Sequence, residues 1–162
     1  MVMLQIDLIS LEICEVINMR KVYYGSMSEF QQFLANNGFV PIKYKRCNCN
    51  GGQEYFINEE CSIVHLLSSR KRAAKPFEAA WHIFTYNPEK SKNNMNRHLV
   101  NIGFSAQLHR VVATTFLGNP TNTGQNDVVF IDGNYDNCHP SNLRWCAHSE
   151  AMKQYHNKKK EN

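Results

Sequence analysis

The chain of 162 residues is long enough for one domain of ordinary size, or for a small domain with an extension. Its charged fraction of 20% and its hydrophobic fraction of 43% are typical of globular proteins and exclude a disordered or membrane-embedded chain. The net charge of +4 permits a nucleic-acid partner but does not require one.

The expected location of the protein follows from features that the sequence lacks. No apolar run reaches the length of a membrane span, and the N-terminus has no basic leader before its apolar stretch. Six cysteines without a secretory signal indicate reduced thiols rather than a disulfide framework. We therefore expect an intracellular protein that is not secreted, either cytoplasmic or associated with a nucleoid or virion, and without a membrane partner.

Residues 1–50 are interpreted as an N-terminal extension with one predicted helix. Residues 8–17, LISLEICEVI, fit neither the helix period nor the strand period cleanly, so a helix and a strand both remain open. In SMSEFQQFLANNG, Ser26 and Glu29 form a capping-box pattern, and Gly38 suits a C-terminal stop. Apolar residues at helical spacing follow this cap: Phe30, Phe33 and Leu34. A polar, glycine-containing stretch at residues 45–53 predicts a boundary.

Residues 51–104 are predicted to form a β-rich hairpin module. The segment EYFINEECSIVHLL favours two short strands around a turn at Asn58–Glu60, because β-favouring side chains flank polar turn residues. A basic connector, SSRKRAAK, follows it and leads to AAWHIFTY, which is strand-like. The polar stretch NPEKSKNNMNR then precedes RHLVNIGF, a further strand candidate.

Residues 105–162 form the third predicted unit. SAQLHRVVATTFLGNP switches to helical spacing, with Ser105 as the expected N-cap and with Gly118 and Pro120 ending the helix. The last segment, AHSEAMKQYHNKKKEN, predicts a short helix that is capped by Ser149 and runs into a basic tail.

Three stretches carry a family resemblance: EYFINEECSIVHLLSS, LHRVVATTFLGNP and VVFIDGNYDNCHPSNLRWCAHSEAM. The first is similar to the hairpin module that often precedes the core of phage-type HNH homing endonucleases, a branch of the ββα-metal (His-Me finger) nucleases. The second is similar to the first helix of that core, and the third to the core itself. The resemblance implies an α+β fold, in which small antiparallel hairpins and an N-terminal helical extension accompany an HNH-like ββα-metal core at residues 105–162.

The resemblance also implies which residues carry the chemistry. In that family a histidine is the general base for the attacking water, and a divalent metal, usually magnesium, stabilises charge on the phosphate. The base position falls on Phe130, and the metal-ligand positions fall on Val129 and Ala151. A motif asparagine falls on Asn142, which alone keeps the expected residue type. Phenylalanine cannot accept a proton, and valine and alanine offer no lone pair to a hard cation.

We therefore expect an HNH homing-endonuclease-like protein that binds nucleic acid but has lost phosphodiester cleavage, a pseudoenzyme without a cofactor. The alternative is an active metal-dependent HNH nicking endonuclease that uses magnesium and displaced ligands. Asp127, His139 and His148 are the candidates for displaced groups, whereas His109 is assigned a structural or DNA-facing role. The third possibility is that the protein is a component recruited into a larger virion or ribonucleoprotein assembly.

The cysteines raise the question of a zinc site. Cys138, His139, Cys146 and His148 are dense in sequence, but they lack the paired knuckles of structural zinc sites. We interpret the cysteines as free thiols that pack like small apolar residues, and we expect no metal.

Basic residues suggest where nucleic acid would bind. A charge run is usually only a solvated surface, but related enzymes follow the duplex with the hairpin module and the C-terminal extension, which favours phosphate contacts here. The expected partner is double-stranded DNA, with RNA as the alternative. The candidate contacts are Arg70, Lys71, Arg72, Lys75, Arg110, Arg144, Lys153, Lys158, Lys159 and Lys160.

Overall fold

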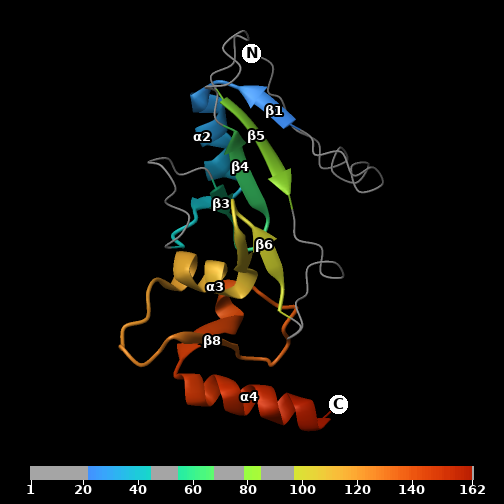
Figure 1. Cartoon of the computed structure of the whole chain (residues 1–162). Helices are drawn as coiled ribbons and strands as arrows, with labels where there is room; N and C mark the ends of the chain where they lie inside the picture. Colours follow the sequence, from blue (N-terminus) through green and yellow to red (C-terminus); the bar gives the residue numbers. More distant parts are fainter. Residues whose placement is uncertain (1–21, 45–54, 68–78, 85–96, 162) are drawn as a thin grey trace.

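The computed structural model describes residues 22–44, 55–67, 79–84 and 97–161, with the backbone alone for residues 158–161. Three stretches from the sequence analysis lie outside the described residues. They are LISLEICEVI, the predicted boundary at residues 45–53 and the basic connector SSRKRAAK. Figure 1 shows an elongated molecule, with a sheet and helix α2 at one end and helix α4 at the other. No helix in the described part of the chain is long and apolar enough to cross a bilayer.

Five of the described strands form one antiparallel sheet, in the order β1-β5-β4-β3-β2. Its strands are β1 (Val22–Gly25), β2 (Val40–Pro41), β3 (Tyr55–Ile57), β4 (Ile63–Leu67) and β5 (Ala79–Phe84). The predicted strands on both sides of the Asn58–Glu60 turn are confirmed, as is the strand in AAWHIFTY. Strands from before and after residue 50 pair in this one sheet, so the N-terminal helix is attached to the hairpin module.

Helix α2 (Met27–Asn36) has the predicted capping box. The Glu29 N–H donates to the Ser26 hydroxyl at 3.2 Å, and the Ser26 N–H donates to the Glu29 carboxylate at 2.7 Å. Gly38 follows the helix with φ +67°, a conformation that favours glycine. Phe30 is buried against Phe56 of β3 and Trp81 of β5, so α2 covers one face of the sheet.

A second hairpin leads from the sheet to the next helix. It consists of β6 (Leu99–Asn101) and β7 (Ser105–Gln107), and α3 (Leu108–Val112) follows and continues into one turn of π-helix, η3 (Ala113–Leu117). The prediction of Ser105 as an N-cap was wrong, because Ser105 pairs with Asn101 in the hairpin. The Leu108 N–H then donates to the His98 carbonyl at 2.9 Å, so strand pairing extends to the start of the helix. Gly118 ends the helical segment, as predicted.

The C-terminal part has the ββα arrangement. Strands β8 (Asp127–Phe130) and β9 (Leu143–Cys146) pair antiparallel, a short 3-10 turn, η4 (Pro140–Asn142), precedes β9, and α4 (His148–Glu161) packs against β8. The prediction of Ser149 as the cap of the last helix was wrong. The N–H groups of Glu150 and Ala151 both donate to the Ala147 carbonyl. The helix therefore begins directly after Ala147, and Ser149 lies within its first turn. The α+β fold class is confirmed.

One hydrophobic core joins the sheet to the C-terminal hairpin. It takes Ile57 and Ile63 from the sheet, residues of α3, and Val128 and Phe130 from β8. The face of β8 that carries Val128 and Phe130 therefore points toward α3 and the sheet, whereas Asp127 and Val129 lie on its other face.

The core position of α3 yields a stability prediction with a matched control in the same helical segment. Leu108 is fully buried and Leu117 is 42% exposed. Leu108→Ala should lower the free energy of unfolding by about 2–5 kcal/mol, because it removes buried methyl groups and leaves a cavity. Leu117→Ala should change it by less than about 0.5 kcal/mol. Urea unfolding followed by circular dichroism measures both, and equal effects would contradict this core assignment.

Candidate functional site

Phe130, where the resemblance places the general base, lies at the end of β8 and is fully buried. The centroid of its ring is 5.2 Å from that of His109 on α3 and 5.3 Å from that of Tyr135 in the β8–β9 loop. The guanidinium carbon of Arg97 lies 5.1 Å from the Phe130 centroid and 4.0 Å from the Tyr135 centroid. Phe130 is thus enclosed by aromatic rings and a cation, with no surface open to water.

Val129 and Ala151, where the resemblance places the metal ligands, have hydrocarbon side chains. Val129 is 2% exposed and lies on the face of β8 opposite Phe130. Ala151 lies in the first turn of α4, and Gln154, one turn later, donates its side-chain amide to the Phe130 carbonyl. Among the described residues, no three His, Cys, Asp or Glu side chains are grouped so that they could hold a metal ion. The donor set at these positions therefore does not fit the divalent ion that HNH nucleases use.

Asn142, the retained motif residue, is buried and fastens the β8–β9 loop. Its amide nitrogen donates to the Asp132 carboxylate and to the Asn137 carbonyl, both at 2.8 Å. Its amide oxygen accepts the Asp132 N–H at 3.0 Å. The Ile131 N–H donates to the Asn142 carbonyl at 2.8 Å. These bonds connect the two ends of the loop, so Asn142 has a structural task that needs no metal and no substrate.

His109 is a buried, neutral imidazole. Burial lowers its pKa to about 3, and the nearby positive charges of Arg97 and Arg110 add to this effect. Its Nδ1 has no hydrogen-bond partner among the described residues. A group with so low a pKa is a weak proton acceptor at neutral pH, and its packing against Phe130 gives it a place in the core.

A polar cluster lies where α3, β8 and α4 meet. The Arg110 guanidinium donates to Asp127 Oδ1 at 2.7 Å, and His148 Nδ1 lies 2.7 Å from Asp127 Oδ2. Asp127 is therefore shared by a cation and an imidazole, and the His148 side chain is 77% exposed. Of the predicted displaced groups, the structure brings Asp127 and His148 together.

His139, the third candidate for a displaced group, is not part of the polar cluster around Asp127. Its Nδ1 is 2.8 Å from the Ser141 hydroxyl, and its Nε2 is 3.6 Å from the Glu59 carboxylate.

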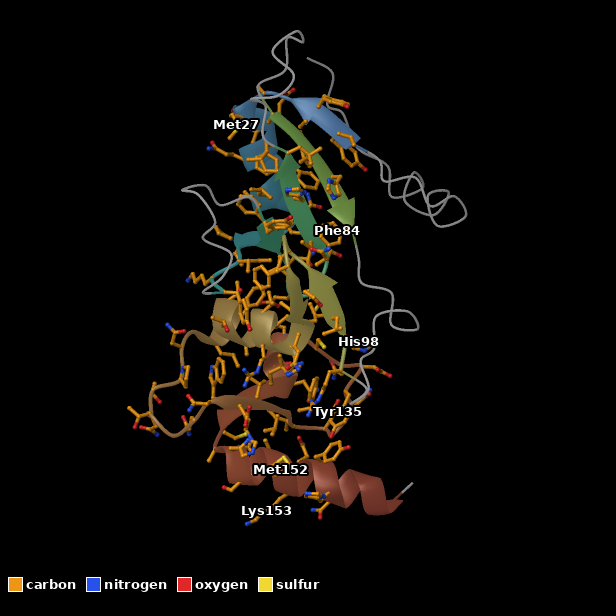
Figure 2. The ribbon with its side chains drawn as sticks, viewed as in Figure 1. Met27, Phe84, His98, Tyr135, Met152 and Lys153 are labelled. Atoms are coloured by element: carbon orange, nitrogen blue, oxygen red, sulfur yellow. The ribbon has the colours of Figure 1, made fainter. Side chains whose placement is uncertain are left out.

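The predicted phosphate contacts are described in part. Arg110 is engaged by Asp127, and the guanidinium of Arg144 donates to the Glu150 carboxylate. This hydrogen bond raises the pKa of Arg144. Lys153 is exposed on α4, and Figure 2 shows its side chain pointing away from the β8–β9 hairpin. Arg70, Lys71, Arg72 and Lys75 lie outside the described residues, as do the side chains of Lys158, Lys159 and Lys160.

The described cysteines Cys61, Cys138 and Cys146 are free and buried. Burial raises the pKa of Cys61 and of Cys138 to about 12, so both stay protonated thiols. The Cys61 thiol donates weakly to the Cys138 carbonyl at 3.6 Å, which fixes the β3–β4 turn against the β8–β9 loop. They pack as small apolar side chains, as interpreted from the sequence.

Two residues at the site were not singled out from the sequence, Arg97 and Tyr135. Arg97 precedes β6 by two positions, and Tyr135 lies in the loop five residues after Phe130. Arg97 lies outside the three stretches that carry the resemblance, and Tyr135 lies within the third but at no position to which the resemblance gives a role. Their contact depends on how the β6–β7 hairpin docks on the loop. Sequence spacing therefore carried no signal for them.

Residues 106–153 match the family described as HNH endonuclease, and this segment spans α3, η3, β8, β9 and the first part of α4. Comparison with curated proteins and with solved structures gave no match. The chain therefore carries an HNH-family endonuclease domain over residues 106–153.

Proposed function

We propose that this HNH domain binds nucleic acid, double-stranded DNA in particular, and no longer hydrolyses phosphodiester bonds. On this proposal the protein is a degenerate relative of the phage-type HNH homing endonucleases that acts inside the cell or within a virion. The observation that carries the proposal is the fully buried ring of Phe130 at the position of the general base.

The energetic argument concerns what the three replacements remove. Losing a general base costs on the order of 10²- to 10⁴-fold in rate. Hydrocarbon at Val129 and Ala151 also removes the ligands for the cation that would stabilise charge on the phosphate. Both losses act on the same step, so cleavage through the family's mechanism would be too slow to serve a function.

The retention of Asn142 fits this proposal. Its hydrogen bonds to Asp132 and Asn137 support the loop whether or not the site is active. A protein that uses the HNH domain as a binding scaffold still needs a folded loop. Selection for a stable scaffold therefore accounts for the motif residue without catalysis.

One observation favours the alternative of an active endonuclease. Asp127 lies beside His148 Nδ1 at 2.7 Å, an arrangement in which a carboxylate orients an imidazole whose other nitrogen faces solvent. Such a pair could act as a displaced general base. It lacks grouped metal ligands among the described residues, however, and Arg110 shares the same carboxylate.

A plasmid assay separates the two functions. Purified protein incubated with supercoiled plasmid and magnesium or manganese should leave the plasmid intact, because no described group replaces both base and ligands. His148→Ala serves as the control, since it removes the displaced candidate and leaves the core untouched. Metal-dependent nicking that disappears in His148→Ala would establish the active alternative instead.

Restoring the family's residues should restore chemistry. The combined change Val129→Asp, Phe130→His and Ala151→Asn is expected to produce weak metal-dependent nicking in the same assay. Phe130→His alone should stay inactive, because a base without a bound metal lacks the main electrostatic stabilisation. A folded triple variant without activity, or full activity from Phe130→His alone, would contradict this account of the lost chemistry.

Binding is tested by its salt dependence. The logarithm of the affinity for a duplex oligonucleotide should fall linearly with the logarithm of salt concentration, with a slope of about −0.9 for each phosphate contact. Fluorescence anisotropy at several salt concentrations measures that slope. Absent or salt-independent binding would favour recruitment into a larger virion or ribonucleoprotein assembly, and tighter binding to duplex RNA would favour the RNA alternative.

A further inference from the structure

An exposed histidine lies beside the positions where the resemblance places the metal ligands. Asp127 shares a face of β8 with Val129, because side chains two apart on a strand point the same way. His148 and Ala151 are neighbours on α4, because side chains three apart on a helix lie on adjacent turns. His148 Nδ1 lies 2.7 Å from Asp127 Oδ2, so this polar pair joins the same two elements as Val129 and Ala151. The pair is therefore adjacent to the place where the resemblance puts the metal and its phosphate.

Asp127 determines which nitrogen of His148 faces solvent. A carboxylate oxygen at 2.7 Å from Nδ1 accepts a hydrogen bond, which requires the proton of the imidazole to be on Nδ1. The His148 side chain is 77% exposed, and its Nε2 makes no hydrogen bond or ion pair with the described residues. In a neutral ring Nε2 offers a lone pair, whereas in an imidazolium it offers an N–H donor. A phosphate oxygen can therefore accept a hydrogen bond from the protonated form alone.

The charged groups around His148 form two ion pairs, one between α3 and β8 and one between β9 and α4: Arg110 with Asp127, and Arg144 with Glu150. Two further titratable groups of α3 and β9 stay neutral. Burial lowers the pKa of His109 to about 3, and burial raises the pKa of the Cys146 thiol. Protonation of His148 therefore adds one positive charge to a region that is otherwise close to neutral.

We propose that His148, in its protonated form, donates from Nε2 to a backbone phosphate of duplex DNA, with Asp127 as the residue that orients the ring. The inference rests on the proposed function, since it names a DNA contact of a domain that binds without cutting. It makes binding depend on pH, because histidine is the side chain that ordinarily changes charge between about pH 5 and 8. The sign of this dependence separates it from the active alternative, in which the base would act through the neutral ring.

The test measures binding of a duplex oligonucleotide by fluorescence anisotropy at about pH 5.5 and about pH 8. Ionic strength is equal at both, and EDTA prevents metal-dependent cleavage. Wild-type protein should bind more tightly at the lower pH, where the magnitude of its salt slope should be larger by about 0.9, the effect of one phosphate contact. His148→Gln should lose on the order of tenfold in affinity at the lower pH and little at the higher pH, because a neutral amide cannot become charged.

Two further variants complete the test. His156→Gln is the matched control, since His156 is exposed on the same helix and has no carboxylate partner among the described residues. It should keep the wild-type response to pH. His148→Arg keeps a positive charge at both pH values, so it should bind at about pH 8 as tightly as wild-type protein at about pH 5.5. Thermal melting confirms that the variants are folded.

Several results would overturn the inference. Wild-type binding that does not tighten at the lower pH, or a wild-type response that persists in His148→Gln, would show that His148 is not the contact. An equal loss in His156→Gln would reduce the effect to net charge, and an equal loss at both pH values in His148→Gln would make the contact independent of protonation. If His148→Gln does not fold, His148→Arg decides alone, and a wild-type pH response in that variant overturns the inference. Wild-type protein that binds duplex DNA at neither pH would instead overturn the proposed function itself.

Discussion

The buried ring of Phe130 is the constraint on which the arrangement of the site depends. It is part of the hydrophobic core that also includes residues of α3 and of the sheet. It contacts His109, Tyr135 and Arg97 as well. At the position where the resemblance places the base histidine of an HNH nuclease, this chain has a buried cluster of rings beside one guanidinium. A charged or hydrated group in place of Phe130 would have to be buried in this core, which costs free energy unless the group is paired. The Phe130 ring, at the position where the resemblance places the base, is therefore part of the core that stabilises the domain.

The rest of the HNH motif can be understood through the loop that follows this ring. Asn142 and Asp132 bond to each other through side chain and backbone, and Gly133 supplies the left-handed conformation, φ +70°, that the turn requires. These contacts are local and independent of metal. A motif defined by nuclease chemistry can thus be retained for structural reasons, and on the proposed function the same residues support a binding scaffold.

Sequence patterns predicted those parts of the fold that are determined locally. The Ser26–Glu29 capping box involves residues three apart, and it formed as expected. The caps assigned to Ser105 and Ser149 were wrong, because pairing with Asn101 and closure onto Ala147 decided where those helices begin. The resemblance implied a ββα core, and in the structure Phe130 ends β8 and Asn142 lies in η4 just before β9, both within the matched residues 106–153. Arg97 and Tyr135 could not be found, because their contact arises from the docking of separate hairpins.

The proposed function depends on one claim, that hydrocarbon side chains occupy the positions where an HNH nuclease would have its base and its metal ligands. The most direct test is a crystal of the protein with duplex DNA and manganese, with diffraction data collected at the manganese absorption edge. The account predicts bound DNA and no anomalous peak beside Asn142. A manganese peak held by side chains near Asn142 and in contact with a phosphate would contradict it.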